Sequence, residues 1–457
     1  MQEGGSVKES LTQGQPTAVP TRAKQAGEDP AVRARRARWM WAEASVWTDR
    51  MLAALENGVK GGVWFSLIDK VYNPMNLWAA WSAVARNAGS AGVDDITTEQ
   101  YECEVEANLV SLARQLWDGQ YQPKAIRRTY IPKSDGKMRP LGIPTVQDRI
   151  VQGAVRQVIE PIFEKQFAAH SYGFRPGRGC RDALRRVQQL METGHHYVVD
   201  ADLKSYFDTI PHQKLMDLVR QRVADGRVLK LIESFLEAKI MEGADQWMPT
   251  SGAPQGAVLS PLLSNIYLDP LDHQMASAGY EMVRYADDFV ILCKTKEQAQ
   301  AALEAVAVWT AQAGLTLHPE KTRIVDARIE PFEFLGYRFE RGRRWPRHKS
   351  MMKLRETIRA KTRRNDGRAL SVIIADVNRS LRGWFGYFKH SYKTVFPGVD
   401  GWVRGRLRSL LRRRHKLRGK AKGKDHQRWP NAYFAGEGFY SLQEAFARAC
   451  RSMKVAH

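Results

Sequence analysis

Two adjacent aspartates stand in the stretch VRYADDFVILC, where Asp287 and Asp288 interrupt a run of apolar and β-branched residues. The flanking residues predict a buried hairpin, in which neighbouring ionised carboxylates repel each other and lose solvation. The pair must therefore lie exposed at a turn, be partly protonated, or be neutralised by a cation. Oxygen ligands without His or Cys nearby favour Mg²⁺ over zinc. The alternative is an ordinary hairpin turn, in which Asp is common.

A second acidic stretch, VVDADLKSYFDTIP, places Asp200 and Asp202 on one face of a predicted strand, because side chains alternate with period two. At least one of these carboxylates can leave the end of the strand towards a metal. Two metal ions bridged by such carboxylates activate an attacking hydroxyl and stabilise a leaving pyrophosphate in polymerases. Asp208, with Thr209 and Pro211, is expected instead to cap the helix HQKLMDLV.

Two further stretches fit phosphate chemistry. SGAPQGAVLSPLLSN is a turn opening a helix, where small residues allow close approach of a substrate and free backbone N–H groups can face phosphate. YIPKSDGKMRP predicts a hairpin on which Lys133 and Arg139 could clamp a triphosphate. Taken singly, the first is only a helix N-terminus and the second only two surface cations.

The surrounding pattern predicts an α+β fold. Apolar residues at helical spacing begin near residue 31, a hairpin follows in RRTYIPKSDGKMRPLGIP, and TVQDRIVQGAVRQVIEPIFE predicts a long helix. Strands and helices then intermix without the regular alternation of a doubly wound sheet, up to the strands TRIVDA and FEFLGYRF. A palm-type domain is the expected outcome.

Positive charge is concentrated near the C-terminus. The chain has 457 residues, with 71 Lys and Arg against 49 Asp and Glu, a net charge of +22. Residues 338–424 alone contain 28 Lys or Arg and 5 Asp or Glu, so this segment carries essentially the whole excess. Its helical stretches are amphipathic with a cationic polar face. A solvated charged face would need acidic partners, so a nucleic acid is the expected ligand.

Composition also excludes several classes of protein. The four cysteines lie far apart, which predicts neither a disulfide framework nor a zinc site. No uninterrupted apolar run approaches the length of a membrane span, and the N-terminus lacks a secretory signal. We expect a cytoplasmic protein without a membrane or disulfide partner, whose residues 1–30 form a disordered basic and polar tail.

Taken together, these stretches resemble the successive blocks of a group II intron-encoded reverse transcriptase and maturase of the bacterial type. The resemblance covers roughly residues 63–430 and lies in IPKSDGKMRPLGIPTVQDRIVQGAV, SYGFRPGRG, VVDADLKSYFD, SGAPQGAVLSPLLSNIYL, RYADDFVILC, GLTLHPEKT and FEFLGYRF, in that order. Upstream, NAGSAGVDDIT is similar to the family's extra N-terminal block. Downstream, LRGWFGYFK resembles the thumb and maturase region that grips intron RNA.

The resemblance implies a role for individual residues. Asp202 and Asp287 would hold two Mg²⁺ ions with Asp288 completing the acidic set, whereas Asp200 drops out because the family's acid begins the block DLKSYF. Phe207 would exclude a ribose 2′-hydroxyl, and Lys321 would protonate the leaving pyrophosphate, although a solvated loop lysine is an equal alternative. The residues expected to contact the incoming dNTP are Lys133, Arg139, Phe207 and Gln255. The residues expected to contact nucleic acid are Arg175, Arg379, Arg382, Lys389, Arg404, Arg408, Arg412 and Arg413.

The resemblance implies a right-hand polymerase with fingers and palm, followed by an α-helical thumb and maturase domain. We expect a helical N-terminal extension and fingers block at 31–110, fingers and palm at 111–340, the basic thumb and maturase domain at 341–430, and a C-terminal segment at 431–457. Its partners would be group II intron RNA, an RNA template and a DNA primer or target, and it would assist splicing and intron mobility. The family's Cys- and His-rich endonuclease extension is not seen, so self-nicking of target DNA is not expected. The alternatives are an RNA-binding maturase without polymerase activity and a domesticated reverse transcriptase in phage defence.

Overall fold

Helices form the N-terminal layer. The computed structural model describes residues 29–132, 136, 138–417 and 423–455. The layer contains α1 (Pro30–Arg38), α2 (Asp49–Asn57), a 3₁₀ turn (Lys60–Gly62), α3 (Ile68–Val71), α4 (Pro74–Asn87), α5 (Thr98–Glu102) and α6 (Val105–Asp118). Asn73 caps α4, and Thr97 with Gln100 forms a capping box on α5, so the helix starts are set by local sequence.

The predicted hairpin belongs to a four-stranded sheet, the fingers sheet. Its strands are β1 (Ile126–Pro132), β2 (Met138–Ile143), β4 (Ile240–Glu242) and β5 (Asp245–Trp247), in the order β2-β1-β4-β5. β1 and β2 pair antiparallel, with Ile131 opposite Arg139. Lys133 and the turn residues Ser134 and Asp135 lie outside the described residues.

A second four-stranded sheet, the palm sheet, has the order β6-β7-β3-β8. Its strands are β3 (Tyr197–Asp202), β6 (Glu281–Tyr285), β7 (Asp288–Cys293) and β8 (Arg323–Asp326). The helices of this part of the chain are α7 (Val146–Glu164), α8 (Cys180–Glu192), α9 (Tyr206–Thr209), α10 (His212–Arg220), α11 (Gly226–Leu236), α12 (Ser260–Ser277) and α13 (Lys296–Gln312). Val199 and Ile291 pack into the main core with side chains of α12 and α13. Val198 and Val290 face the opposite side, against α8. Alternation along each strand therefore buries both faces of the sheet.

The chain then leaves the palm through a three-stranded sheet of order β11-β10-β9, made of β9 (Phe332–Phe334), β10 (Tyr337–Glu340) and β11 (Arg343–Pro346). The basic segment follows as helices with their own hydrophobic core. These are α14 (His348–Lys361), α15 (Leu370–Phe388), α16 (Val395–Arg414), α17 (Gly423–Arg428), α18 (Asn431–Gly436) and α19 (Leu442–Val455). Asp400 of α16 is buried and accepts hydrogen bonds from Leu442 N and Gln443 N, which fixes the start of α19.

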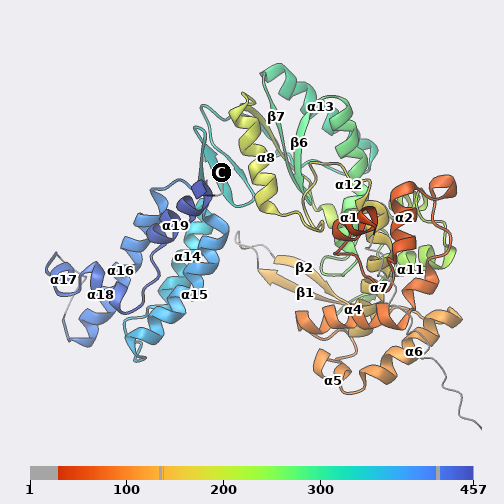
Figure 1. Ribbon diagram of the computed structural model, residues 1–457, viewed down its shortest axis with the longest axis horizontal. Coiled ribbons are helices and arrows are strands. Elements are labelled where there is room, and N and C mark those ends of the chain that lie inside the picture. Colours follow the sequence, from red (N-terminus) through yellow and green to blue (C-terminus); the bar gives the residue numbers. More distant parts are fainter. Residues whose placement is uncertain (1–28, 133–135, 137, 418–422, 456–457) are drawn as a thin grey trace, which may run out of the picture.

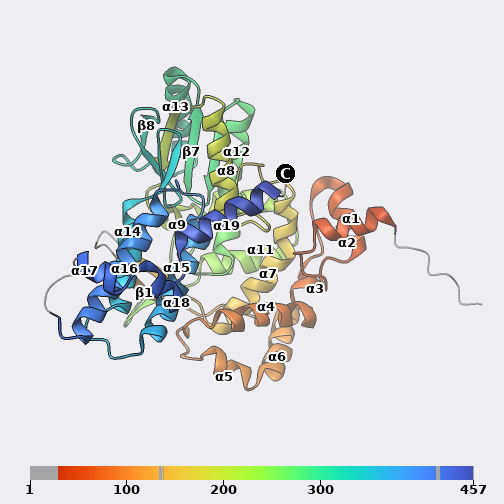
Figure 2. The ribbon, with the colours of Figure 1, turned by 60° about the vertical axis from the view of Figure 1, so that its left-hand side comes forward.

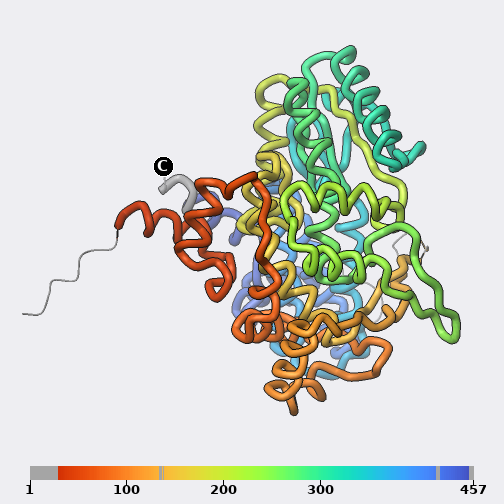
Figure 3. The backbone as a smooth tube through the Cα atoms, turned by 90° about the vertical axis from the view of Figure 1, so that its right-hand side faces the viewer, coloured from red at the N-terminus to blue at the C-terminus, as the bar shows by residue number. Residues whose placement is uncertain are grey.

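The three parts are spatially distinct. The palm sheet with α13 lies at one end of the molecule and α5 and α6 at the other (Figures 1, 2 and 3). The C-terminal helices lie to one side, and the β1–β2 hairpin points towards α14 and α15 (Figure 1). The molecule is thus an α+β protein with a helical C-terminal domain, as the sequence predicts.

Most predicted elements are present, but one cap is wrong. The helix expected to be capped by Asp208 begins at His212 with Pro211 as its N-cap and no side-chain cap bond. Asp208 instead lies inside the one-turn helix α9. In the described part of the chain, no helix combines the length and apolar character needed to cross a membrane.

Candidate active site at the end of the palm sheet

Strand register brings the acids of the two predicted motifs together. β3 and β7 pair antiparallel, and Asp202 lies directly opposite Asp288. Directly opposed residues share a face of the sheet, with Cβ atoms about 4.5–5.5 Å apart. Asp287 occupies the tight connection between β6 and β7, next to Ala286, whose φ is 59°. Residues about 85 positions apart in the chain therefore converge at one end of the sheet.

The turn that carries Asp287 is held from beneath by a buried arginine. Arg284 is fully buried, and its Nη1 donates to the carbonyl of Ala286 at 2.9 Å and to Oδ1 of Asn265 at 3.0 Å. Its Nε donates to both carboxylate oxygens of Asp272, at 2.8 and 3.0 Å. The left-handed conformation of Ala286 costs energy in a non-glycine residue, and these contacts hold it in place.

A glycine loop packs against the same turn. A Cβ on Gly173 would lie 2.2 Å from the backbone nitrogen of Ala286, so only glycine allows this approach. Asn265 Nδ2 donates to the carbonyl of Gly173 at 2.8 Å. The amide of Tyr172 donates to the carbonyl of Arg284 at 2.9 Å. The block SYGFRPGRG thus supports the acids structurally.

Burial and mutual repulsion raise the pKa of the acids. Burial, and then the charges of Asp200, Asp287 and Asp202, raise the pKa of Asp288 to about 7. Burial and the charge of Asp202 also raise the pKa of Asp287. Crowded carboxylates of this kind are stabilised by a cation at the same place.

The side chains do not form a ready-made metal cage. Among the described residues, no group of three or more His, Cys, Asp or Glu side chains is arranged to hold a metal ion. Ion binding would therefore require the carboxylates of Asp202, Asp287 and Asp288 to reorient. The donor set itself, oxygen only and crowded enough to raise two pKa values, fits a hard divalent cation.

Lys321 is placed beside the acids by the loop that precedes β8. Its ammonium forms an ion pair with the carboxylate of Asp202. The loop is fixed to the sheet because the amide of His318 donates to the carbonyl of Asp202 at 2.7 Å. The side chain of Lys321 is 60% exposed, so its ammonium is accessible from solvent.

The turn of SGAPQGAVLSPLLSN joins palm to fingers. The amide of Gly142 in β2 donates to the carbonyl of Gln255 at 2.7 Å, and a Cβ on Gly256 would lie 2.6 Å from the carbonyl oxygen of Gly142. Oε1 of Gln152 accepts from the amide of Val258 at 2.8 Å, which anchors the turn to α7. The side chain of Gln255 is partly exposed.

The same turn also supports Phe207. The amide of Ala253 donates to the carbonyl of Phe207 at 2.7 Å. The Phe207 ring is half-buried and lies 5.4 Å from the ring of Tyr206 in an edge-on arrangement. Tyr206 is in turn fixed by donation from its hydroxyl to the carbonyl of Ser264 at 2.8 Å.

Arg139 extends the site onto the fingers. Its positive charge lowers the pKa of Asp287, against the larger effect of burial, so the β1–β2 hairpin lies near the acidic turn. Lys133, predicted to act with Arg139, is outside the described residues. The hairpin therefore contributes at least one described cation to the neighbourhood of the acids.

Three residues predicted to contact nucleic acid have their guanidinium groups paired within the protein. Arg175 has a side chain only 2% exposed, which pairs with Glu164 and donates to the carbonyls of Ala168 and Ser171. Its guanidinium is occupied inside the protein, so a template contact is not expected of it.

Arg408 and Arg412 are likewise structural residues. Arg408 is 2% exposed and its Nε donates to the carbonyl of Trp429 at 2.9 Å. Arg412 forms an ion pair with the buried Asp425 at 2.9 Å. The helical pattern assigned these arginines to the cationic face, but α17 and α18 cover that part of α16.

The other predicted basic residues remain accessible to different degrees. Arg379, Arg382 and Arg413 are exposed, whereas Lys389 and Arg404 are half-buried. Arg382 lies over the Tyr440 ring at 4.8 Å and Arg404 over the Phe439 ring at 5.9 Å. These residues stay candidates for phosphate contacts.

Sequence reasoning missed Arg284 and Asp272. Arg284 directly precedes the YADD stretch at a position where strand alternation points inwards, and a buried arginine needs a buried partner. That conflict was the available signal. Asp272 lies on α12 in LDPLDHQM and gave no comparable signal by spacing.

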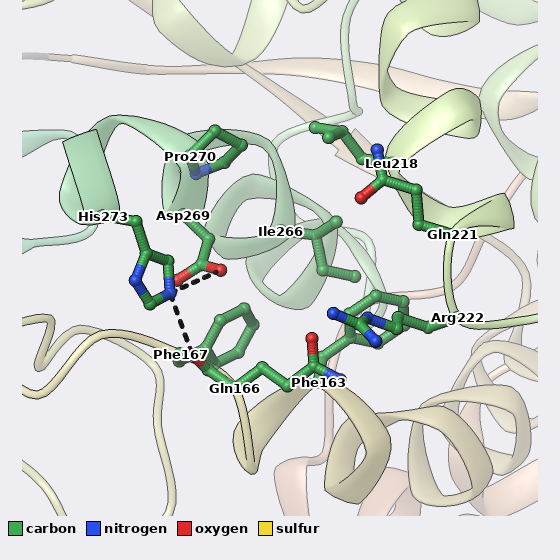
Figure 4. Close-up of a pocket in the computed structure, with 10 residues that line it drawn as sticks. All are labelled: Phe163, Gln166, Phe167, Leu218, Gln221, Arg222, Ile266, Asp269, Pro270 and His273. Carbon is green, nitrogen blue, oxygen red and sulfur yellow. Dashed lines mark hydrogen bonds and ion pairs between the residues drawn. The ribbon is translucent and has the colours of Figure 1, made fainter. Parts of the chain in front are cut away.

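A cavity of about 220 Å³ behind the palm is separate from these acids. It lies between α7, α10 and α12, and Figure 4 shows His273 paired with Asp269 and with the backbone of Gln166. Its lining includes none of the predicted site residues. The acidic end of the palm sheet is therefore the better candidate for chemistry.

Fold and site together define a nucleic-acid polymerase of the right-hand type. Residues 131–339 match the family described as Reverse transcriptase (RNA-dependent DNA polymerase), and residues 351–429 match that described as Group II intron, maturase-specific domain. The chain belongs to the reverse transcriptase family of group II intron type.

Individual relatives agree with this assignment. The chain is 35% identical to Protein YkfC of Escherichia coli (strain K12) over 335 residues, 65% of this chain and 87% of that protein. It is 40% identical to Group II intron-encoded protein LtrA of Lactococcus lactis subsp. cremoris over 188 residues, 41% of this chain and 31% of that protein. The match thus spans less than a third of LtrA.

Among solved structures, a chain of the Partial Cas6-RT-Cas1--Cas2 complex is 26% identical, over 54% of this chain and 41% of that chain. Its TM-score is 0.35, and no conclusion about fold or function rests on it. The family matches favour the reverse transcriptase and maturase function over a maturase without polymerase activity and over a role in phage defence.

Proposed function

We propose that the chain copies RNA into DNA with a two-metal site held by Asp202, Asp287 and Asp288, and that its basic helices bind group II intron RNA. The observation that carries the proposal is the register of β3 and β7, which opposes Asp202 and Asp288 beside the Asp287 turn. Magnesium bound there would supply the charge that activates a primer 3′-hydroxyl and neutralises the triphosphate.

The protein's own residues then position the substrates. Arg139 binds a phosphate oxygen of the incoming dNTP, because an arginine can do so with two parallel hydrogen bonds. Gln255 lies on the turn between fingers and palm and contacts the nucleotide. Lys321 moves from the carboxylate of Asp202 to the β-phosphate and gives its proton to the leaving pyrophosphate.

Phe207 selects the sugar in this proposal. Its ring is half-buried and its backbone is fixed to Ala253, which places the ring where it would contact a ribose 2′-hydroxyl. A Phe207→Val variant is expected to keep incorporating dNTPs and to incorporate rNTPs at least about tenfold better than wild type, since roughly 1.4 kcal/mol of discrimination gives that factor. Single-nucleotide extension with each nucleotide measures the ratio. An unchanged ratio would remove Phe207 from the site.

The polymerase activity itself is tested by extension of a DNA primer on an RNA template with dNTPs and MgCl₂. Purified wild-type protein should extend the primer, and a template-free control should not. Failure to extend, with intron RNA still bound, would leave only the maturase part of the proposal.

RNA binding by the basic helices is tested by its salt dependence. Phosphate contacts release counterions, so the logarithm of affinity should fall linearly and steeply with the logarithm of salt concentration. Arg379→Gln and Arg413→Gln should each lower the slope by about 1. A flat response would argue against these helices as the RNA-binding surface.

A further inference from the structure

An apolar pocket of about 330 Å³ lies between β11, α14 and α16. Figures 1 and 2 place α14 beside α16 on the C-terminal side of the molecule. Its lining is mostly apolar or aromatic and includes one arginine. The lining residues are Trp345, Pro346, Met351, Leu354, Arg355, Thr394, Val395, Gly398, Val399 and Trp402. None of the residues assigned to the active site lines it.

Arginines lie over aromatic rings in and beside this pocket. The guanidinium carbons of Arg355 and Arg359 each lie 5.9 Å from the centroid of the Trp402 ring. That of Arg343 lies 4.2 Å from the Tyr392 ring, which is 5.1 Å from the Trp345 ring. Stacking on aromatic and guanidinium planes is how proteins hold unpaired bases.

Charge complementarity identifies the occupant. The pocket lies within residues 338–424, where Lys and Arg greatly outnumber Asp and Glu. A purely apolar peptide would bring no negative charge to Arg343, Arg355 and Arg359. A nucleotide in a strand offers a planar base to the pocket and a phosphate on each side of that base to the arginines. A double helix keeps its bases stacked and cannot fill the pocket.

We propose that this pocket receives one unstacked base of single-stranded RNA, with Arg343, Arg355 and Arg359 meeting the phosphates that flank it. The inference rests on the proposed RNA-binding function and names the chemistry of one subsite. It requires an RNA that exposes an unpaired base, such as a loop or a bulge.

Two glycines of α16 provide a matched test. Gly398 lines the pocket, and a Cβ there would meet nothing within 4 Å, so the side chain of Gly398→Leu has room to occupy part of the pocket. Gly401 is exposed on the same helix, also has open space around its Cβ and does not line the pocket. Leucine has a higher helix propensity than glycine, so both variants of the full chain should fold, which their thermal unfolding midpoints verify.

The probes are a fluorescent single-stranded RNA of mixed sequence and the blunt RNA duplex made from it. Gly398→Leu should weaken single-strand binding roughly 5- to 100-fold, the loss expected for one stacked base, with the salt slope unchanged. Duplex binding by Gly398→Leu, and both affinities of Gly401→Leu, should equal those of wild type. Arg359→Gln should instead lower the salt slope by about 1.

The outcomes separate the inference from the proposed function. If Gly398→Leu binds the single strand as tightly as the wild-type protein does, the base pocket is overturned but the proposed RNA-binding function is not. The pocket would then be left to another ligand, such as an apolar peptide. An equal loss on single strand and duplex also overturns it, since base insertion requires unpaired RNA. No RNA binding by wild type would overturn the proposed function and this inference with it.

Discussion

At the scale of single residues, the site depends on charges that are held together against repulsion. Asp202, Asp287 and Asp288 converge, and burial and repulsion raise the pKa of Asp287 and Asp288. The arrangement is supported by a fully buried ion pair between Arg284 and Asp272. Removing one partner of such a pair leaves the other buried and uncompensated.

The first prediction concerns this pair. Arg284→Met should lower the free energy of unfolding by about 3–5 kcal/mol and release the turn that carries Asp287. Urea unfolding measures the stability, and primer extension measures the activity of the folded fraction. The control is Arg185, which is exposed and pairs with Asp182 at 3.1 Å. Arg185→Ala should change the free energy of unfolding by no more than about 0.5 kcal/mol. Equal effects of both substitutions would contradict the role given to Arg284.

At the scale of elements, two tight turns bring segments distant in the chain into register. The Asp287 turn rests on the Gly173 loop, and the turn containing Gln255 rests on Gly142 of β2. In both places backbone meets backbone where a Cβ would intrude. The motifs SYGFRPGRG and SGAPQGAVLSPLLSN therefore contain glycines that are needed for close backbone packing.

The second prediction uses the glycines of SYGFRPGRG. Gly173→Ala should displace the Asp287 turn and reduce the rate of primer extension on the order of 100-fold, because small misplacements of catalytic groups are costly. Gly179 lies in the same loop, with an extended φ of −153° and nothing within 4 Å of an added Cβ. Gly179→Ala should therefore keep activity within about twofold, since it alters only the cap of a helix. Steady-state kinetics on an RNA template gives both rates. Similar rates for the two variants would refute the packing argument.

Sequence alone predicted the local elements, and the register of β3 and β7 brings the predicted acids together. Asp287 and Asp288 break an apolar strand, a conflict that only a site or a turn resolves, and α7, α12 and α13 follow from their apolar spacing. It could not predict which arginines of the basic segment are buried, because a helical pattern defines a polar face but not the element that later covers it. Arg408 illustrates the limit, since its partner Trp429 belongs to the segment after α17. Likewise, the domain boundary expected at residue 340 falls between β10 and β11. These strands pair with each other, and the sequence of neither strand alone predicts that pairing.

At the scale of the whole molecule, the polymerase and the basic helices are joined at a cationic junction. His390 follows α15, half-buried, and burial and then the charges of Arg344, Lys389, Arg181 and Arg185 lower its pKa to about 4. Nη2 of Arg181 in α8 also donates to the carbonyl of Gly386 at 2.6 Å, so palm and C-terminal helices meet here. A positive charge on His390 is therefore unfavourable at this junction.

The third prediction follows from this depressed pKa. Between pH 4 and the ordinary value of 6.5, His390 is neutral in the folded chain and protonated in the unfolded chain, so the unfolded state binds more protons and stability should rise with pH across this window. His390→Gln should flatten that part of the profile relative to wild type. Urea unfolding at pH 4.5, 5.5 and 7 tests it, and parallel profiles for the two proteins would contradict it.

The most direct test of the proposed polymerase site compares wild type with Asp287→Asn in extension of a DNA primer on an RNA template, with RNA affinity measured on the same preparations. Asn keeps the size of the side chain and removes its charge, so the fold and the basic helices are unaffected. We predict that synthesis is abolished while RNA binding stays at the wild-type level. DNA synthesis by Asp287→Asn at a rate near that of wild type would contradict it.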